Sequence, residues 1–291
     1  MDPYTFFRLI FFLFGSFVLA LFSLYERAHA YVPKTRFVLE KTAKNHGRGY
    51  YAIQMEITFR TAGGTTSVIE NWLIENGESM FMEARGPGAP AFVIYKGRQK
   101  LFIDEHGQER ATRIPADFFE DTFHYRSLES FAEELIRDNI VTQKILARDP
   151  KVKNAKEAAQ ARDPFIRLAR SDGTVTYGIG KATPPDSAPL PGIWIEQDRF
   201  HIQRLRLPST AEILADEYTD YGRGLSFPKA RSVSWGENSV SIRTVKVTPI
   251  TPTPDMKAKL QPSYLRSKKT TVTASSGEIL PVVKEFYSRF R

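Results

Sequence analysis

The sequence contains no cysteine among its 291 residues. This absence excludes disulfide bonds, cysteine nucleophiles, zinc sites built on cysteine pairs and a lipid-modified N-terminal cysteine. Histidine is also scarce, and the five histidines share no metal-ligand spacing. We therefore expect neither a metal ion nor a cofactor. With 12% aromatic and 25% charged residues, the composition is that of a folded chain rather than a disordered one.

Apolar runs long enough for a membrane are missing except near the N-terminus, where residues 9–25 are uncharged and mostly apolar. Arg8 precedes this run, and the small residues Ala28 and Ala30 follow it. This layout predicts a secretory signal peptide, residues 1–30, that is cleaved after Ala30. The alternative is an uncleaved N-terminal anchor. In both cases we expect the remaining chain to function outside the cytoplasm, tethered to the membrane if the segment is not cleaved.

Recognisable catalytic motifs are missing as well. Residues 173–183 contain the glycines and the lysine of a phosphate loop, but Val175 stands where the first glycine should be, and no helix pattern follows. Paired carboxylates for glycoside hydrolysis can come from distant strands, and nothing in the sequence singles out such a pair. We therefore expect a protein that is not an enzyme.

The densest group of chemically versatile side chains surrounds Gly107 and consists of Asp104, Glu105, His106 and Glu109. These residue types can bind a metal ion or exchange a proton. A single turn, however, rarely supplies converging ligands. Two strand-like runs flank the group, so we expect a solvated hairpin tip there.

What the sequence does contain is a long series of strand patterns. The clearest covers residues 50–60, where apolar and polar side chains alternate. Turn signals such as Asn76-Gly77 separate the runs. Further strands are expected at residues 65–75, 79–84, 91–95, 100–104, 165–170, 174–180, 191–197, 199–207, 210–221, 228–235 and 239–247.

Helices are expected in three places. A short helix begins near Pro33 and ends before Asn45. A second lies within residues 115–141, where Ser127 is the expected N-cap and one apolar stripe runs through residues 128–136. The third is an amphipathic helix near the end of the sequence, with Val282, Val283, Phe286 and Phe290 on one side.

The order of these elements predicts an α+β fold in which helices cover one face of an antiparallel sheet. Because no linker divides the strands, we expect one domain over residues 31–250. Prolines mark two loops, at residues 184–191 and 249–262. Residues 251–291 are therefore expected to form a proline-rich linker followed by the amphipathic helix.

Three stretches of the sequence carry a family resemblance: the first strand at residues 50–59, the segment at 95–109 and the segment at 217–247. The last segment contains a tyrosine-rich turn, a Phe-Pro pair and a Val-x-Val pattern, formed by Tyr218, Tyr221, Phe227, Pro228, Val245 and Val247. Together these stretches resemble the family of periplasmic outer-membrane lipoprotein carriers and sigma-factor regulators. The resemblance implies an incomplete antiparallel β-barrel of about 10–12 strands, closed by helices over an apolar concavity that accepts acyl chains or a lipidated partner.

The apolar face of the first strand is the predicted lining of this cavity. Methionines among aromatic residues suit a pocket for chains of variable shape, because the thioether is flexible and polarisable. The alternative is an ordinary core packed by the helix at 128–136. The candidate ligand-binding residues are Tyr51, Ile53, Met55, Ile57, Phe59, Trp72, Met80 and Met82.

The formal net charge of +8 allows a second kind of contact. Basic residues gather between 144 and 162, a segment with few large apolar side chains. They indicate either attraction to anionic lipid head groups or cell-wall polymer, or simply solubility. Nucleic acid is not an expected partner outside the cytoplasm. The candidate contact residues are Lys144, Arg148, Lys151, Lys153 and Lys156.

Two functions are consistent with these features of the sequence. The first is a non-enzymatic periplasmic protein that binds an acyl chain, a lipid or a lipidated partner in an apolar cavity, in the trafficking of outer-membrane lipoproteins or lipids. The alternative is a structural or sensor protein of the cell envelope that binds a protein or an anionic polymer through its basic surface.

Overall fold

A computed structural model describes residues 32–61, 64–103, 108–147, 163–268 and 280–291. The chain divides into two compact units, Met1–Pro33 and Lys34–Arg291. The predicted signal segment, residues 1–30, lies outside the described residues. Among the helices of the described ranges, none is both long and apolar enough to cross a membrane.

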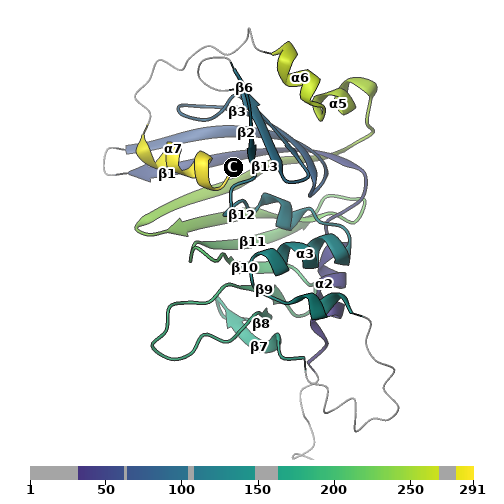
Figure 1. Ribbon diagram of the computed structural model, residues 1–291, viewed down its shortest axis with the longest axis vertical. Helices are drawn as coiled ribbons and strands as arrows, with labels where there is room; N and C mark the ends of the chain where they lie inside the picture. Colours follow the sequence, from purple (N-terminus) through teal and green to yellow (C-terminus); the bar gives the residue numbers. More distant parts are fainter. Residues whose placement is uncertain (1–31, 62–63, 104–107, 148–162, 269–279) are drawn as a thin grey trace, which may run out of the picture. The chain divides into compact units, whose positions relative to one another are not determined.

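The second unit is built on one antiparallel sheet of 13 strands (Figure 1). The first six strands form a meander: β1 (Tyr50–Thr61), β2 (Gly64–Asn76), β3 (Ser79–Arg85), β4 (Phe92–Lys96), β5 (Gln99–Ile103) and β6 (Glu109–Arg113). The other seven form a second meander: β7 (Ile166–Ser171), β8 (Thr174–Ile179), β9 (Gly192–Glu196), β10 (Ile202–Arg206), β11 (Glu212–Asp220), β12 (Ser226–Trp235) and β13 (Asn238–Ile250).

Pairing of β1 with β13 joins the two meanders, so that β6 and β7 are the two edges of the sheet. The sheet therefore does not close into a barrel. Together with the helices that pack on it, this confirms the expected α+β fold with an incomplete antiparallel barrel. The strand count is slightly higher than expected, since β6 carries only polar and small side chains that give no alternating pattern.

The alternation predicted for β1 is present. Its apolar side chains are buried on one side, which we call the inner face, while the intervening residues are more exposed. Pairing places Trp72 beside Ile53 and Ile242 beside Ile57 on this same face. Because paired residues share a face of a sheet, the register extends the inner face across β2, β3, β12 and β13.

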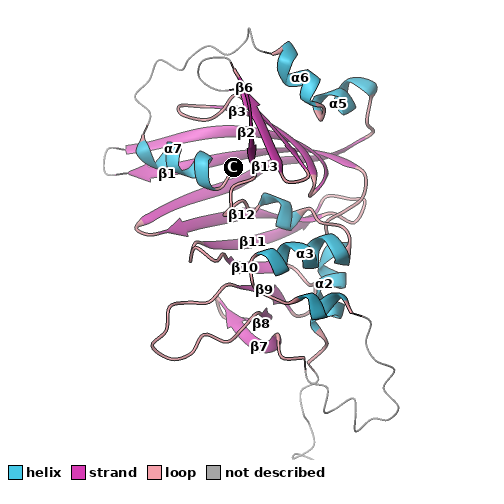
Figure 2. Ribbon diagram, viewed as in Figure 1, coloured by secondary structure: helices cyan, strands magenta, loops and turns pink. Residues whose placement is uncertain are grey.

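Two of the expected helices pack together beside the second meander (Figure 2). They are α2 (Thr35–Lys44) and α3 (Leu128–Arg137). Ser127 caps α3 as predicted, because its hydroxyl oxygen accepts a hydrogen bond from the Ser130 N–H at 3.1 Å. Two short 3₁₀ helices flank α3, η1 (Glu120–Phe123) and η2 (Gln143–Leu146).

The proline-rich stretch after β13 was expected to be a loop, and this expectation is wrong. It contains two short helices, α5 (Pro254–Lys259) and α6 (Pro262–Ser267). Each begins with a proline, which suits the first turn of a helix because its missing N–H would have no intrahelical partner there. Leu260 and Leu265 pack against apolar side chains of the opposite, outer face of the first meander, namely Leu73, Phe81, Ile94, Leu101 and Ile103.

The last described helix is α7 (Pro281–Arg289), and it packs on the inner face. Figure 1 shows it in yellow at the sheet surface near β1. Its ring of Phe286 meets the ring of Phe59 edge to face, with centroids 5.4 Å apart. The amphipathic pattern predicted for this segment is thus explained by burial of Val283 and Phe286.

Replacement of Ile57 by alanine tests how tightly the inner face is packed. Ile57 is fully buried in the middle of β1. We expect Ile57→Ala to lower the free energy of unfolding by about 2–5 kcal/mol, through lost transfer energy and a residual cavity. Urea unfolding provides the measurement. Val245→Ala on the neighbouring strand is the control, because Val245 is 53% exposed and its loss should cost about 0.5 kcal/mol or less. Equal effects of the two variants would show that the inner face is loosely packed.

Candidate functional site

All eight residues predicted to line an apolar cavity lie on the inner face, and each is 2% exposed or less. Phe59 contacts α7, and Trp72 stacks on Tyr95 with ring centroids 5.6 Å apart. Met55 accepts a hydrogen bond from Arg231 at its sulfur, 2.9 Å away. The structure therefore gathers these side chains beneath other parts of the same chain. Their role as ligand-binding residues stays a prediction.

Helix α7 covers this region with aromatic side chains. Phe286 and Phe290 both contact Trp235 of β12, with ring centroids 6.2 Å and 4.9 Å apart. Phe290 also meets Phe119, just before η1, at 6.2 Å. At the rim, the Trp235 indole N–H donates to the Glu285 carboxylate at 2.7 Å. The aromatic side chains of α7 and of Phe290 thus cover this part of the inner face.

The side chain of Arg291, two residues after α7, is a buried cation that holds the end of the helix on the sheet. Its Nε lies 3.1 and 3.2 Å from the two carboxylate oxygens of Glu70, and its Nη2 lies 3.4 Å from a carboxylate oxygen of Glu120. Burial alone would lower the pKa of Arg291, but the charges of Glu70 and Glu120 outweigh it and raise that pKa above its ordinary value. Arg291 is therefore charged and paired with both carboxylates.

Glu120 has a second cationic partner in Arg231. The Nη1 of Arg231 donates to both Glu120 oxygens at 3.0 Å, and none of the three side chains of Arg231, Arg291 and Glu120 is exposed. Burial opposes ionisation of Glu120, yet Arg231 and a hydrogen bond from His124 hold its pKa well below the usual range. The charged groups of Glu70, Glu120, Arg231 and Arg291 on the inner face are out of contact with solvent, so each is stabilised by a neighbouring group of opposite charge.

Lys100 completes the contacts at the end of the segment. Its Nζ donates to the main-chain oxygens of Tyr287, at 3.1 Å, and of Arg291. Burial lowers the pKa of Lys100 to about 8, and the positive charge of Arg291 acts in the same direction. Side chains of the sheet, rather than backbone pairing, therefore bind α7 and the residues after it.

This charged group was not predicted from the sequence, although its strand members follow the strand pattern. Glu70 stands between Val68 and Trp72 at an inward position of β2, and Arg231 occupies the equivalent kind of position in β12. The sequence does contain one indication of these buried charges: each stands on a strand face whose other residues are mostly apolar. The pairing of these charges could not be predicted from the sequence, because the partners are more than 100 residues apart.

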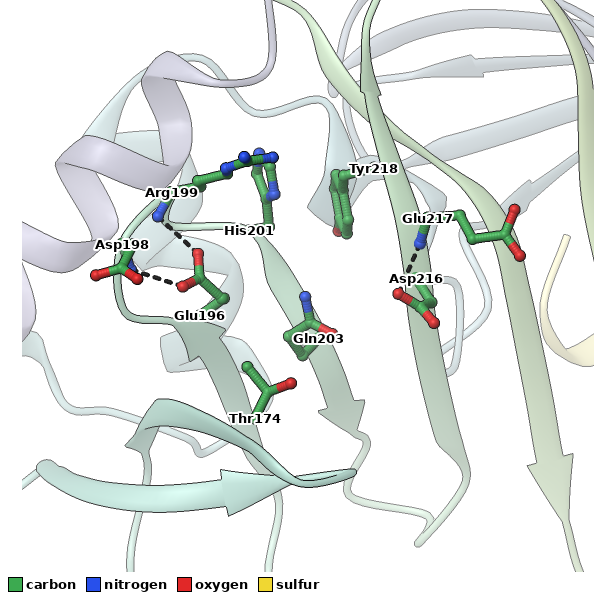
Figure 3. A pocket seen from close by; sticks show the side chains of 9 residues that line it. All are labelled: Thr174, Glu196, Asp198, Arg199, His201, Gln203, Asp216, Glu217 and Tyr218. Carbon is green, nitrogen blue, oxygen red and sulfur yellow. Dashed lines mark hydrogen bonds between the residues drawn. The ribbon is translucent and has the colours of Figure 1, made fainter.

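A second candidate site is an open polar pocket of about 300 Å³ over β8 to β11 (Figure 3). Glu196 is fixed there, since its carboxylate accepts hydrogen bonds from the main-chain N–H groups of Asp198 and Arg199 at 2.7 and 2.6 Å. The residues that line the pocket are Thr174, Glu196, Asp198, Arg199, His201, Gln203, Asp216, Glu217 and Tyr218.

One histidine of this pocket has the geometry of a catalytic base. His201 Nε2 lies 2.8 Å from the Ser226 hydroxyl, and its ring stacks on Tyr218 with centroids 4.2 Å apart. Burial lowers the pKa of His201 and favours its neutral form. Within the part of the chain that the structure describes, however, no carboxylate is hydrogen-bonded to the other ring nitrogen, so the orienting group of a nucleophilic triad is missing.

The remaining predicted contacts are only partly described. Lys144 lies in η2 and is exposed, whereas Arg148, Lys151, Lys153 and Lys156 lie outside the described residues. Residues 104–107, which include Asp104, Glu105 and His106 of the group around Gly107, also lie outside the described residues. The remaining member of that group, Glu109, is described, and it pairs with Arg266 at 3.0 Å. In the described ranges, no three histidine, aspartate or glutamate side chains form a group that could bind a metal ion.

Beneath α3 lies a further buried acidic group. The Tyr125 hydroxyl is 2.9 Å from the Asp121 carboxylate and 3.0 Å from that of Glu134. A phenol has one proton to donate, so both contacts are favourable only if a carboxyl also carries a proton. Burial raises the pKa of Asp121 to about 7, which allows it to be that group. Arg137 forms an ion pair with Glu134 and lies 3.9 Å from Asp121.

Comparison with known proteins gives no match to a family model and no match to a curated protein. Among solved structures, the chain is similar to a LolA-superfamily protein from Nitrosomonas europaea, with 11% identity over 80% of this chain and 100% of that one and a TM-score of 0.47. It is similar to an outer-membrane lipoprotein-sorting protein domain from Vibrio parahaemolyticus, with 10% identity over 79% and 97% and a TM-score of 0.49. It is also similar to a DUF1329-family protein from Desulfovibrio piger, with 11% identity over 80% and 100% and a TM-score of 0.47.

Removal of the charge of Glu120 tests the buried ion pairs. Glu120→Gln leaves the guanidinium groups of Arg231 and Arg291 short of a carboxylate, and we expect a loss of about 3–5 kcal/mol in the free energy of unfolding. Glu83→Gln is the matched control, since Glu83 pairs with the exposed Arg85 and its loss should cost about 1 kcal/mol or less. Urea unfolding of both variants measures the difference. Similar small losses would contradict the assigned pairing.

The raised pKa of Asp121 predicts how stability depends on pH. The folded protein binds this proton more tightly than the unfolded chain does, because an unfolded aspartate has a pKa of about 3.9. The contribution of Asp121 to stability therefore falls as the pH rises from about 4 to about 7. Urea midpoints at pH 5 and pH 8 should differ less in Asp121→Asn than in the wild type, whereas Asp186→Asn, an exposed change, should keep the wild-type difference. Identical pH dependence in all three proteins would contradict the assignment.

Proposed function

We propose that the protein is a non-enzymatic periplasmic binding protein that holds an acyl chain, a lipid or a lipidated partner against the inner face of its sheet, with α7 as the occupant when no ligand is bound. The observation that supports this most directly is the position of α7. A nine-residue helix that follows both meanders in the sequence lies on the inner face and buries its own aromatic side chains there.

The chemistry of the covered surface suits an acyl chain. Phe59, Trp72 and Met82 line it, with further apolar side chains from β1 and β3, and all are almost fully buried. Flexible methionine side chains adapt to guests of different shape. A ligand that replaced Phe286 and Phe290 would bury a similar kind of apolar surface, which is the main favourable term in such binding.

The manner in which α7 is bound also supports exchange. The hydrogen bonds and ion pairs from this segment to the sheet are made by side chains, chiefly through Arg291, Glu285 and Lys100. Buried ion pairs contribute little net stability, because desolvation offsets most of their attraction. Undocking of α7 therefore requires no strand to leave the sheet.

A neutral acyl probe tests this proposal. In Arg291→Ala the ion pairs to Glu70 and Glu120 are absent, so α7 leaves the inner face more readily and the fraction of binding-competent molecules rises. We expect a pyrene-labelled monoacylglycerol to bind at least tenfold more tightly to Arg291→Ala than to the wild type, as measured by fluorescence titration. The gain reports competition between the helix and the probe for one surface.

Arg266→Ala is the control, since Arg266 of α6 pairs with Glu109, away from the inner face, and is largely exposed. It should bind the probe as the wild type does. If neither the wild type nor Arg291→Ala binds the probe saturably, while both remain folded by circular dichroism, the inner face is a permanent core and the proposal fails.

A further inference from the structure

The guanidinium group of Arg291 lies in a pocket that the sheet and η1 build for a cation. The carboxylates of Glu70 and Glu120 are its ion-pair partners. The rings of Trp72 and Phe119 lie 5.5 and 4.9 Å from its guanidinium carbon, distances at which an aromatic face attracts a positive charge. Two further contacts come from the same segment as Arg291: the Phe286 ring lies 5.1 Å from the guanidinium carbon, and the Phe290 main-chain oxygen accepts a hydrogen bond from Nη1 at 3.1 Å. Glu70, Glu120, Trp72 and Phe119 belong to other elements, so the cation pocket does not depend on α7 for them.

The two carboxylates differ in what they retain without Arg291. Glu120 keeps both hydrogen bonds from Arg231. Glu70 keeps only the hydrogen bond that the Trp72 indole N–H donates to it at 2.9 Å. In the described structure no ion pair joins Glu70 to Lys100, although both side chains lie on the inner face. An uncharged amphiphile would offer Glu70 hydrogen bonds but no compensating charge, so it should bind more weakly than one whose head group is cationic.

A second observation at the same place is the hydroxyl of Tyr95. This side chain is fully buried and its oxygen has no hydrogen-bond partner among the described residues. Its ring stacks on Trp72, and the charges of Arg291, Glu70 and Glu120 all act on its ionisation. A polar group left unsatisfied beside an ion pair is unusual in a core that serves only stability.

We propose that Glu70 and Glu120, together with Trp72 and Phe119, form a cation-binding site, and that the ligand of the inner face is an amphiphile whose head group carries a positively charged nitrogen. This inference rests on the proposed function and names its substrate class. The head-group nitrogen takes the place of the Arg291 guanidinium, and the acyl chain takes the place of Phe286 and Phe290. Lys100, released from the main-chain oxygens of Tyr287 and Arg291, donates to an oxygen of the head group where the head group has one.

The net charge of the chain has the opposite effect on ligand binding to that of the proposed cation site. At a formal net charge of +8, non-specific attraction favours anionic amphiphiles. A preference for cations can therefore come only from a local site.

The experiment follows α7 directly. Glu285→Cys places the single cysteine of the chain beside Trp235, where the wild-type side chains are hydrogen-bonded at 2.7 Å. A bimane label at this position is quenched by the indole when α7 is docked and brightens when it leaves. We titrate the labelled protein with dodecylammonium, dodecanoate and dodecyl maltoside, each below its critical micelle concentration. Dodecylammonium should brighten the label at a concentration at least tenfold lower than dodecanoate.

Two further variants assign the preference to Glu70. In labelled Glu70→Gln the advantage of dodecylammonium over dodecanoate should disappear. Glu56→Gln removes one negative charge from the outer face of the sheet, on the neighbouring strand β1, and should keep the advantage. Because Glu70→Gln leaves Arg291 without its main partner, the double variant Glu70→Gln with Arg291→Gln is measured as well. It can retain a hydrogen bond between two neutral side chains, and it too should show no cation preference.

The outcomes separate this inference from the proposed function. If dodecanoate or dodecyl maltoside brightens the label as readily as dodecylammonium, α7 does yield to amphiphiles, but the cation site is refuted. If the preference survives in both variants that lack Glu70, the site is assigned to the wrong carboxylate and the inference fails. If no amphiphile brightens the label, even in the Arg291→Ala background, the proposed function fails together with it.

Discussion

The arrangement of the inner face depends on the ion pairs between Arg291 and the carboxylates of Glu70 and Glu120. A carboxylate on a strand whose other inward side chains are apolar is tolerated only with a partner of opposite charge. The sheet supplies Arg231 for Glu120, and the segment after α7 supplies Arg291 for Glu70 and Glu120. The same ion pairs therefore neutralise the carboxylates of the sheet and position α7, so that Glu70 and Arg291 each lose their ion-pair partner if the helix leaves.

Much of the scaffold follows from the sequence, because strand alternation and helix capping are local. The alternation in residues 50–60 predicts the inner face of β1, and the register of pairing then carries that face to Trp72 and Ile242. Ser127 predicts the start of α3 for a similar reason, since its side chain caps the turn that follows it. These features need no knowledge of distant residues.

The features that could not be predicted from the sequence depend on contacts between distant residues or on ambiguous local signals. Prolines break helices in their interior but suit the first turn, so Pro254 and Pro262 are typical of a loop and yet each begins a helix. The polar edge strand β6 has no alternation to detect. The pairing of Glu70 with Arg291 joins residues 221 positions apart and becomes visible only when both elements are folded.

The two faces of the first meander are covered in physically different ways, and this difference bears on which cover can move. On the outer face, Leu260 and Leu265 join a buried cluster of apolar side chains, and the polar contacts of this cover, such as Arg266 with Glu109, involve solvent-accessible side chains at its rim. On the inner face, α7 adds aromatic burial to ion pairs whose attraction is largely offset by desolvation. Under the proposed function, a guest that brings both an apolar chain and a cation would replace both kinds of contact that α7 makes, whereas the cover formed by α5 and α6 offers no buried charge to replace. The cover that we propose to be exchangeable is therefore the one that contains the buried charges.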